Sequence, residues 1–191
     1  MVNIFNSRAK RPSHYAYAVV TGAASGIGRS FALELAKRGS AVVCADMNLP
    51  AAEETAAQII ESGGNAYPVH CDVGEATQVE QLAHQSESLL GHPVTLVINN
   101  AGVGLGGKFD ELTLEDWKWC MDVNLWGVIH GCHYFVPGFK QQGGGAIINV
   151  ASAASFTAAP EMSAYNVTKA GVRALSETLY AELRKDNIRV N

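Results

Sequence analysis

The sequence of 191 residues lacks several features that mark particular classes of protein. It has no run of eighteen apolar residues, so no helix is predicted to span a membrane. Its 14 lysines and arginines are scattered rather than massed, which argues against electrostatic binding of nucleic acid. Hydrophobic residues make up 48% of the chain and the net charge is only −4, which excludes a disordered chain. These absences indicate one folded domain with a sizeable core.

Cysteine is rare, and the cysteines lack the paired spacing of a disulfide framework or a zinc site. The four cysteines are far apart in the sequence: Cys44, Cys71, Cys120 and Cys132. His130 and His133 flank the last of them, but no third ligand of a suitable type lies nearby in the sequence, so we expect these residues to pack or to lie at the surface. We therefore expect reduced thiols, no metal site and a cytoplasmic location.

The first residues carry basic side chains but no apolar stretch after them, so they do not resemble a secretory signal. We expect residues 1–15 to form a mobile N-terminal arm. Residues 16–191 are then expected to form a single catalytic domain that binds a dinucleotide.

Short apolar runs alternate with amphipathic segments along this domain. Strands are predicted over 17–20, 41–45, 66–71, 94–98 and 146–150, and a sixth from 188. Helices are predicted over 26–38, 49–62, 75–90 and 163–184, and another from 113 to about 134, before Pro137. Strand–helix alternation builds parallel βαβ units, and continuous apolar strands are typical of a sheet covered on both faces. The predicted fold is α/β: a doubly wound parallel sheet with helices on both faces, Rossmann-like and three-layered.

The sixth predicted strand begins at Ile188, and Asn191 is the last residue of the sequence. Such a strand has little room to finish. We therefore expect the domain to be truncated at the start of its sixth strand, with its C-terminal part and a portion of the substrate pocket missing.

A glycine-rich turn lies between the first predicted strand and the first predicted helix. Its sequence is Thr21-Gly22-Ala23-Ala24-Ser25-Gly26-Ile27-Gly28, with the spacing G-x-x-x-G-x-G. Glycine allows a sharp turn and lets the backbone approach a pyrophosphate, toward which the helix N-terminus directs N–H groups and a partial positive charge. We predict that Gly22, Ser25, Gly26, Ile27 and Gly28 bind a dinucleotide. A merely structural turn is the alternative.

Asp46 lies just after the second predicted strand, 18 residues beyond Gly28. A carboxylate there can accept hydrogen bonds from both ribose hydroxyls of an adenosine, and it would repel a 2′-phosphate. Neither Met47 nor Asn48 is basic, and the glycine turn carries no basic residue. These observations favour NAD over NADP as the cofactor.

Polar and small residues follow the third and fourth predicted strands. Asp72 and Val73 follow the third, and Asn99-Asn100-Ala101-Gly102 follows the fourth. Because the carboxyl ends of parallel strands form the edge where ligands bind in open α/β folds, these residues are expected to line one cofactor cleft. We expect Asp72 to hold the adenine amino group, with Val73 against the ring. The small residues Ala101 and Gly102 permit a flat cofactor to approach closely.

Tyr165 and Lys169 are four residues apart on a predicted helix and therefore share a face. A free tyrosine titrates near pH 10, but a neighbouring ammonium group favours the phenolate and makes a phenol useful for acid–base catalysis near neutral pH. The spacing Y-x-x-x-K alone arises by chance in many helices. Its position relative to the other motifs is what makes it informative.

Two polar residues strengthen this interpretation. Ser152 follows the fifth predicted strand, 13 residues before Tyr165, at the same sheet edge as the glycine turn. Its hydroxyl is placed to hydrogen-bond a substrate carbonyl or alkoxide. Asn124 lies in an otherwise apolar part of the long predicted helix, where asparagine is unfavourable unless its side chain has a role. We predict that Asn124 holds a water molecule between Lys169 and solvent.

Taken together, these residues resemble the short-chain dehydrogenase/reductase family in its compact single-domain form. The resemblance covers about residues 17–190, and the motifs occur in the order of the family: Thr21-Gly22-x-x-x-Gly26-Ile27-Gly28, Asp72-Val73, Asn99-Asn100-Ala101-Gly102, Asn124, Ser152 and Tyr165-x-x-x-Lys169. It implies that Tyr165 is the catalytic acid/base and that Ser152 positions the reacting oxygen. It also implies that Lys169 binds the nicotinamide ribose and that Asn124 completes a proton relay.

The resemblance further implies a cofactor site in which the glycine turn surrounds the pyrophosphate, Asp46 contacts the adenosine ribose, and Asn100 and Ala101 line the channel. The implied activity transfers a hydride between NAD and a secondary alcohol or ketone, in a homotetramer or homodimer. The resemblance also implies a Pro-Gly turn, a substrate lid and a seventh strand beyond the sixth strand, and we expect these to belong to the missing C-terminal part.

Other functions fit some of the same motifs. A non-catalytic NAD-binding sensor or scaffold needs the glycine turn but has no use for Ser152, Tyr165 and Lys169. An epimerase or dehydratase on the same fold is usually longer. The sequence does not identify the substrate, but apolar residues in the loops 103–110 and 153–162 favour a mostly apolar small molecule: Leu105, Phe109, Phe156 and Met162. Trp117 and Trp119 are interpreted as packing or interface residues.

Overall fold

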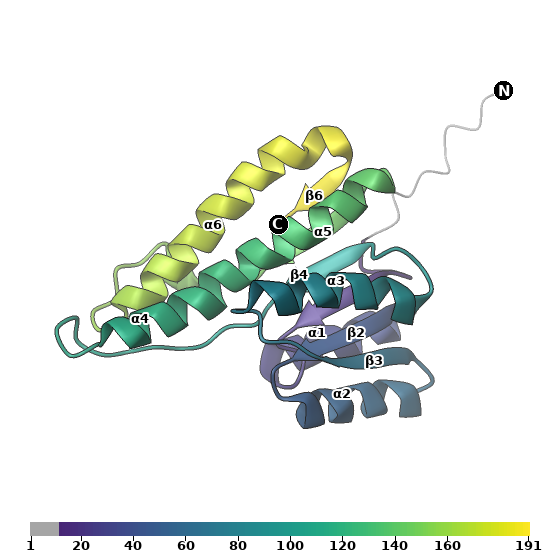
Figure 1. The fold of residues 1–191 in the computed structure, drawn as a ribbon, viewed down its shortest axis with the longest axis horizontal. Coiled ribbons are helices and arrows are strands. Elements are labelled where there is room, and N and C mark those ends of the chain that lie inside the picture. Colours follow the sequence, from purple (N-terminus) through teal and green to yellow (C-terminus); the bar gives the residue numbers. More distant parts are fainter. Residues whose placement is uncertain (1–11) are drawn as a thin grey trace.

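The computed structural model describes residues 12–191 (Figure 1). Within them, six strands form one sheet in the order β3-β2-β1-β4-β5-β6, and all neighbouring strands are parallel. The strands are β1 (Tyr17–Thr21), β2 (Ala41–Asp46), β3 (Asn65–His70), β4 (Leu96–Asn99), β5 (Gly145–Asn149) and β6 (Ile188–Val190). The chain reverses its direction of travel across the sheet between β1 and β4, which is the doubly wound, Rossmann-like order. The predicted fold class is therefore confirmed.

The helices alternate with the strands as predicted. They are α1 (Gly26–Lys37), α2 (Leu49–Glu61), α3 (Ala76–Leu90), α4 (Leu114–Met121), α5 (Gly127–Gln141) and α6 (Ser163–Leu183). Glycine ends two of them for a conformational reason. Gly39 and Gly91 follow α1 and α3 with φ values of 79° and 66°, in the left-handed region that other residues avoid.

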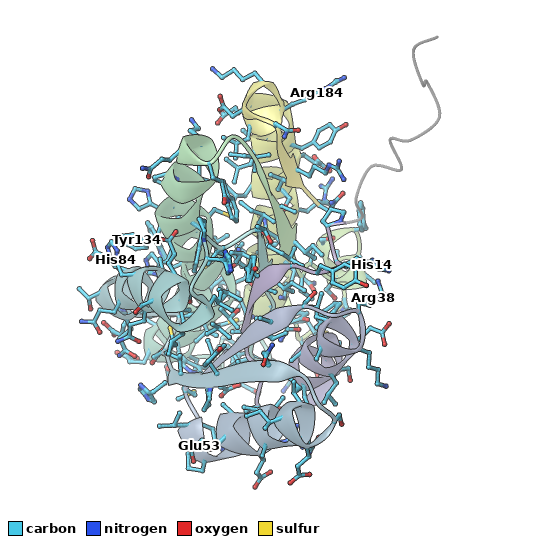
Figure 2. All side chains as sticks on the ribbon, turned by 90° about the vertical axis from the view of Figure 1, so that its right-hand side faces the viewer. His14, Arg38, Glu53, His84, Tyr134 and Arg184 are labelled. Atoms are coloured by element: carbon cyan, nitrogen blue, oxygen red, sulfur yellow. The ribbon has the colours of Figure 1, made fainter. Side chains whose placement is uncertain are left out.

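Two hydrophobic clusters lie on opposite faces of the sheet. Because side chains alternate along a strand, Val19 of β1 packs on one face while Ala18 and Val20 pack on the other. The first face is covered by α3, α5 and α6, and the second by α1 and α2. Figure 2 shows the same layers: His84 of α3 and Tyr134 of α5 lie on one side of the strands, and Arg38 at the end of α1 lies on the other.

The long helix predicted to end before Pro137 differs from the structure in two ways. It contains a π-helical turn, η1 (Asp122–Trp126), between α4 and α5, and α5 runs through Pro137 to Gln141. Proline removes one N–H donor from a helix, a loss that tertiary packing can offset. Here Phe135 and Phe139, on the two turns around Pro137, are buried in the core of the first face. Burial of these rings stabilises the last turn, so the predicted end near Tyr134 was wrong.

Other boundaries agree with the predictions to within a few residues. Pro68 lies inside β3, where it is tolerated because β3 is an edge strand of the sheet. Most of the predicted N-terminal arm, residues 1–11, lies outside the described residues. Near its end, Ser13 accepts a hydrogen bond from Arg38 (2.9 Å), and the Tyr15 N–H donates to the Arg38 carbonyl (3.2 Å).

Candidate active site

A cleft of about 1340 Å³ lies at the carboxyl edge of the sheet. It is bounded by the segments that follow β1, β2, β3, β4 and β5, together with α4 and the first turns of α6. The predicted residues that line it are Gly22, Ser25, Gly26, Ile27, Gly28, Asp46, Asp72, Val73, Asn100, Ala101, Gly102, Ser152, Tyr165 and Lys169. Residues that are far apart in the sequence thus converge on one cavity, and among the predicted site residues only Asn124 does not line it.

The glycine turn is packed so tightly that side chains are excluded from it. A Cβ atom on Gly28 would lie 2.0 Å from the Gly22 carbonyl oxygen and 2.5 Å from the Asn100 amide nitrogen. A Cβ atom on Gly22 would lie 2.8 Å from the Ala101 Cα, and Gly22 also has a φ of 66°. The Asn100 amide completes the arrangement by donating to the carbonyl oxygens of Thr21 (3.0 Å) and Gly22 (3.3 Å).

The first turn of α1 opens toward the cleft without a side-chain cap. Its N-cap residue, Ser25, forms no capping hydrogen bond, and the first turn carries no acidic residue. The N–H groups at the start of a helix are unsatisfied unless a cap, water or a ligand accepts from them. This end of α1 is therefore suited to an anionic group.

Asp46 at the end of β2 faces the glycine turn. One carboxylate oxygen accepts from the Ala24 N–H (2.9 Å), and the other accepts from the Asn48 N–H (2.9 Å). These two bonds fix the orientation of the carboxylate at the wall of the cleft. A fixed negative charge at this point favours neutral hydroxyl groups over a phosphate.

Asp72, Val73 and the buried Cys71 form the part of the cleft that follows β3. The Asp72 carboxylate accepts from the Gly74 N–H at 2.9 Å, which fixes the turn after the strand. Burial raises the pKa of the Cys71 thiol to about 12, and the nearby carboxylates of Asp72 and Asp46 act in the same direction. Cys71 therefore stays protonated at neutral pH and serves as a small apolar wall.

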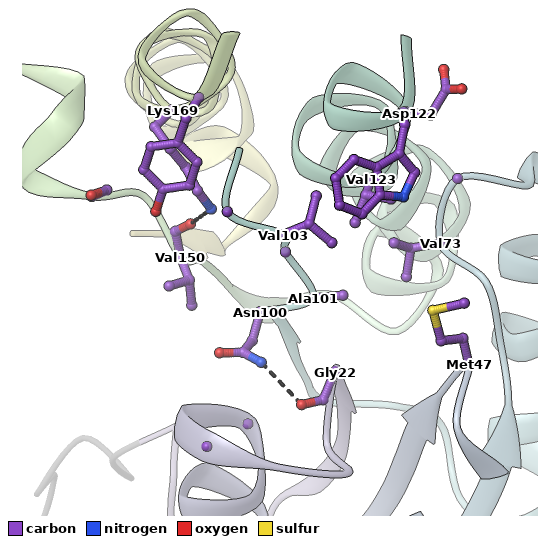
Figure 3. A pocket seen from close by; sticks show the side chains of 18 of the residues that line it. Gly22, Met47, Val73, Asn100, Ala101, Val103, Asp122, Val123, Val150 and Lys169 are labelled. Atoms are coloured by element: carbon purple, nitrogen blue, oxygen red, sulfur yellow. Dashed lines mark hydrogen bonds between the residues drawn. The ribbon is translucent and has the colours of Figure 1, made fainter. Parts of the chain in front are cut away.

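Tyr165 and Lys169 lie on the same face of α6, as the four-residue spacing predicts. The Lys169 ammonium nitrogen is 5.8 Å from the centre of the Tyr165 ring and donates to the Val150 carbonyl at 2.9 Å. Figure 3 shows the Lys169–Val150 bond at one end of the cleft. Ser152 follows β5 on the same wall, and its hydroxyl oxygen accepts from the Ala154 N–H (3.2 Å). Among the described residues, the Ser152 hydroxyl donates to no protein acceptor, so its hydrogen is available to a ligand.

Lys169 is an unusually buried cation, with a relative exposure of 4%. Burial lowers the pKa of its ammonium group, and the neighbouring Cys120 partly opposes this effect. The unfolded chain, with a lysine pKa of about 10.4, therefore binds more protons than the folded chain in the interval just below that value. Stability rises with pH across this interval, because deprotonation removes the cost of burying the charge.

This pH dependence is open to measurement with the variant Lys169→Met. We expect the free energy of unfolding of the unchanged protein to rise relative to that of the variant as the pH increases toward about 10.4. Urea unfolding at a series of pH values checks this, with the exposed Lys37→Met on α1 as the control for loss of a lysine. A difference that stays flat or falls over the same range would contradict the proposed burial cost.

Asn124 lies in the π-helical turn η1 and is fully buried. Its side-chain oxygen accepts from the Val103 N–H (2.7 Å), and its amide nitrogen donates to the Val103 carbonyl (2.9 Å). The same nitrogen lies 3.4 Å from the Thr168 hydroxyl, and that hydroxyl donates to the Tyr165 carbonyl (2.8 Å). Asn124 thus connects the floor of the cleft to the turn of α6 that carries Tyr165. The water relay predicted for it stays a prediction.

Several cleft residues were not identified from the sequence. On α4 and η1 these are Glu115, Lys118, Trp119, Asp122 and Val123. Their helical spacing of three and four residues, leading up to Asn124, was the available signal. Trp119, which we expected to be a packing or interface residue, lines the cleft.

The apolar side chains expected to line the substrate pocket are mostly elsewhere. Of the four, only Met162 lines the cleft. Phe109 is 73% exposed and contacts the edge of the Trp117 ring, and Phe156 is 76% exposed and lies against the Arg173 guanidinium. Leu105 is not among the lining residues either. The predicted wall was wrong for these three residues because an apolar residue in a loop does not reveal which way it points.

The four cysteines are buried and unpaired. His130 hydrogen-bonds to the Val73 carbonyl (2.9 Å), and Cys132 contacts Asn99 and Asn149. Over residues 12–191, no group of three or more histidine, cysteine or acidic side chains is arranged to hold a metal ion. No helix in the same range has both the length and the apolar character needed to cross a membrane.

Comparison with known proteins gives consistent results. The family model described as short chain dehydrogenase matches residues 16–191. The "Probable oxidoreductase EphD" of Mycobacterium tuberculosis is 41% identical over 165 residues, which are 86% of this chain and 28% of EphD. Cyclohexanol dehydrogenase of Acinetobacter sp. is 36% identical over 192 residues, covering all of this chain and 73% of that enzyme.

Among solved structures, a short-chain dehydrogenase/reductase from Burkholderia phymatum in complex with NAD superimposes with a TM-score of 0.89 and 37% identity. The match covers 94% of this chain and 64% of that protein, so the chain spans less than two thirds of the Burkholderia protein. The family match over residues 16–191 agrees with the sheet order and with the ordered motifs around the cleft. The chain therefore belongs to the short-chain dehydrogenase/reductase family of oxidoreductases.

Proposed function

We propose that the protein is an NAD(H)-dependent oxidoreductase that interconverts a secondary alcohol and the corresponding ketone. The observation that carries this proposal is the shared cleft: Ser152, Tyr165 and Lys169 line the same cavity as the glycine turn and Asp46. A cavity that combines an acid/base pair with a dinucleotide-type turn is suited to redox chemistry on a small molecule. The dehydrogenase named among its relatives supports the same reaction class.

The residues present fit a dinucleotide. The uncapped start of α1 offers N–H groups to a pyrophosphate, and a Cβ atom on Gly26 would face open space, with no neighbouring atom within 4 Å. Asp46 would hold the adenosine ribose, and Asp72 with Val73 would hold the adenine. Asn100, Ala101 and Gly102 would form the floor, and Lys169 would bind the second ribose. When bound, a nicotinamide group supplies the acceptor or donor of the hydride.

The protein's own residues would manage the proton. Tyr165 would take the hydroxyl proton of an alcohol, or return it to a ketone oxygen. Ser152, whose hydroxyl oxygen already accepts from the Ala154 N–H, would donate its hydroxyl hydrogen to the same substrate oxygen. The Lys169 ammonium group, 5.8 Å from the ring centre, would place a positive charge beside the phenol that exchanges the proton. Asn124 would complete a relay by which the proton reaches solvent.

Turnover by the purified protein tests the proposal. With a panel of secondary alcohols and NAD, we expect the absorbance of the reduced nicotinamide to increase. NAD binding without any turnover across alcohols and ketones would instead support the non-catalytic sensor. Substrate conversion without net NADH formation would support an epimerase or dehydratase.

The preference for NAD is proposed to depend on the charge of Asp46. Asp46→Asn keeps a side-chain oxygen for the Ala24 N–H but removes the charge that repels a 2′-phosphate. We expect the ratio of kcat/KM for NAD to kcat/KM for NADP to fall by at least about tenfold. Asp72→Asn removes a different carboxylate of the cleft, one proposed to contact the adenine rather than the ribose, and should change kcat/KM for both cofactors alike. An unchanged ratio in Asp46→Asn would show that selectivity arises elsewhere.

A further inference from the structure

Three large apolar side chains are left exposed inside the cleft. Ile27 is 64% exposed, Met47 is 66% exposed and Trp119 is 48% exposed, and all three line the cavity. Large apolar side chains gathered in a concave site indicate a ligand with apolar faces. Ile27 and Met47 belong to the segments after β1 and β2, whereas Trp119 belongs to α4.

The direction of Trp119 follows from its neighbours on α4. Successive residues of a helix are about 100° apart around its axis. Cys120 and Asn124 face α6, because both are buried and the Asn124 amide contacts Thr168. Trp119 therefore lies about 100° from Cys120 around the axis.

The other flank of this helix faces the loop after β3. Lys118 pairs with Asp122, and a Cβ atom on Gly74 would lie 3.4 Å from the Asp122 Cβ. The hydrogen bond to Asp122 and the charge of Asp122 raise the pKa of the Lys118 ammonium group, and the charge of Glu75 adds a smaller contribution in the same direction. Between the flank with Cys120 and the flank with Lys118 lies a third face of the helix. This face carries Trp119 and, one turn later, Val123, and both residues line the cleft.

That face belongs to the end of the cleft away from Lys169. Figure 3 shows Val123, Val73 and Met47 together at one end, with Lys169 and Val150 at the other. The consecutive helical segments α4, η1 and α5 are held close to this end of the cleft. Gly127, the first residue of α5, is so near Val73 that an added Cβ atom would lie 2.6 Å from a Val73 methyl group. Trp119 is thus on the same helix face as Val123, at the end that contains Asp72 and Val73.

We propose that Trp119 binds the adenine ring of the dinucleotide by stacking its indole on the face of the base. The inference rests on the proposed function, since it requires a dinucleotide in this cleft. Adenine has two apolar faces and a polar edge, which match an indole above the ring and a carboxylate at Asp72 beside it. An aromatic side chain can stack on any base, because every base has an aromatic face. Trp119 would therefore raise the affinity for the dinucleotide without discriminating between adenine and other bases.

ADP-ribose is the probe that isolates this contact, because it contains the adenosine and the pyrophosphate but no nicotinamide. Calorimetric titration should show binding about 5- to 100-fold weaker in Trp119→Ala than in the unchanged protein. Trp119→Phe keeps an aromatic face and should lose much less affinity. Trp126→Ala is the matched control, because Trp126 is also 48% exposed but lies against His130 outside the cleft.

Fluorescence gives a second readout that a merely structural role would not change. AMP should quench the tryptophan emission of the unchanged protein and of Trp126→Phe, and this quenching should be lost in Trp119→Phe. ADP-ribose affinity equal to that of the unchanged protein in Trp119→Ala would overturn the inference. A raised KM for the alcohol alone would also overturn it, by assigning Trp119 to the substrate.

The two proposals fail in different ways. If the unchanged protein binds neither NAD nor ADP-ribose, the proposed dinucleotide site is wrong, and so is the proposed role of Trp119. If the unchanged protein binds both and Trp119→Ala binds both equally well, only the role of Trp119 is wrong. Thermal unfolding of each variant is the control for folding, and we expect the half-exposed Trp119 side chain to be removable without loss of the fold.

Discussion

Replacing Tyr165 with phenylalanine is expected to lower kcat by about 10²- to 10⁴-fold, the usual contribution of a positioned acid/base. The substitution removes one oxygen atom and keeps the ring that lies beside Lys169 at the wall of the cleft. Affinity for NAD should therefore change by less than about threefold, because the proposed cofactor contacts of the glycine turn, Asp46 and Lys169 all remain. A loss of kcat with preserved binding is the signature of a group that acts in the transition state.

Steady-state kinetics and calorimetric titration with NAD measure the two quantities separately. Tyr180→Phe is the matched control, because Tyr180 lies on the same helix, is 54% exposed and does not line the cleft. It should leave both quantities unchanged. If Tyr165→Phe retained kcat within about twofold, the acid/base role of Tyr165 would be wrong, whatever the cofactor affinity.

The parts of the site that the sequence predicts well are those fixed by topology. Parallel strands place their carboxyl ends at one edge, so residues after different strands converge even when they are far apart in sequence. Gly22, Asp72 and Asn100 lie just after strands β1, β3 and β4, and Asp46 is the last residue of β2. All four line one cleft. The four-residue spacing of Tyr165 and Lys169 similarly predicts that both side chains lie on one face of α6. No side-chain contact had to be known for these predictions.

The residues that sequence reasoning misplaced depend on how a segment packs rather than on where it lies. Pro137 is a helix breaker by local propensity, yet the buried rings of Phe135 and Phe139 keep α5 helical around it. Phe109 and Phe156 are apolar residues, yet both are largely exposed and neither lines the cleft: Phe109 lies against Trp117, and Phe156 lies against Arg173. Hydrophobicity identifies a side chain that gains from burial, but it does not identify the surface against which that side chain packs.

Asn124 shows an intermediate case. The sequence indicates that a polar side chain in an apolar helical stretch must have a partner. It does not indicate that the partner is the Val103 backbone, 21 residues away, bound through both atoms of the amide. The π-helical turn at 122–126 also has no evident sequence signal, although π-helical turns are frequent at functional sites.

Gly28→Ala is expected to destabilise the fold and the proposed dinucleotide site together. The added Cβ would lie 2.0 Å from the Gly22 carbonyl oxygen and 2.5 Å from the Asn100 amide nitrogen. Neither neighbour is the free end of a flexible side chain, because the first is backbone and the second is held by the carbonyl oxygens of Thr21 and Gly22. The helix must therefore move away from the turn. Overpacking of this kind costs about 1–3 kcal/mol of the free energy of unfolding.

The glycine turn and the N–H groups at the start of α1 would bind the pyrophosphate together. The same movement of α1 separates these N–H groups from the turn. We therefore expect ADP-ribose affinity to fall by at least about tenfold, measured by calorimetry, beside the loss of stability in urea. Gly138→Ala is the matched control: Gly138 lies within α5, and its added Cβ would meet only a Glu87 carboxylate oxygen at 3.6 Å. Alanine there should leave ADP-ribose binding unchanged and raise stability by up to about 1 kcal/mol. If Gly28→Ala kept full affinity and stability, the close contact between α1 and the turn would not be what shapes the phosphate site.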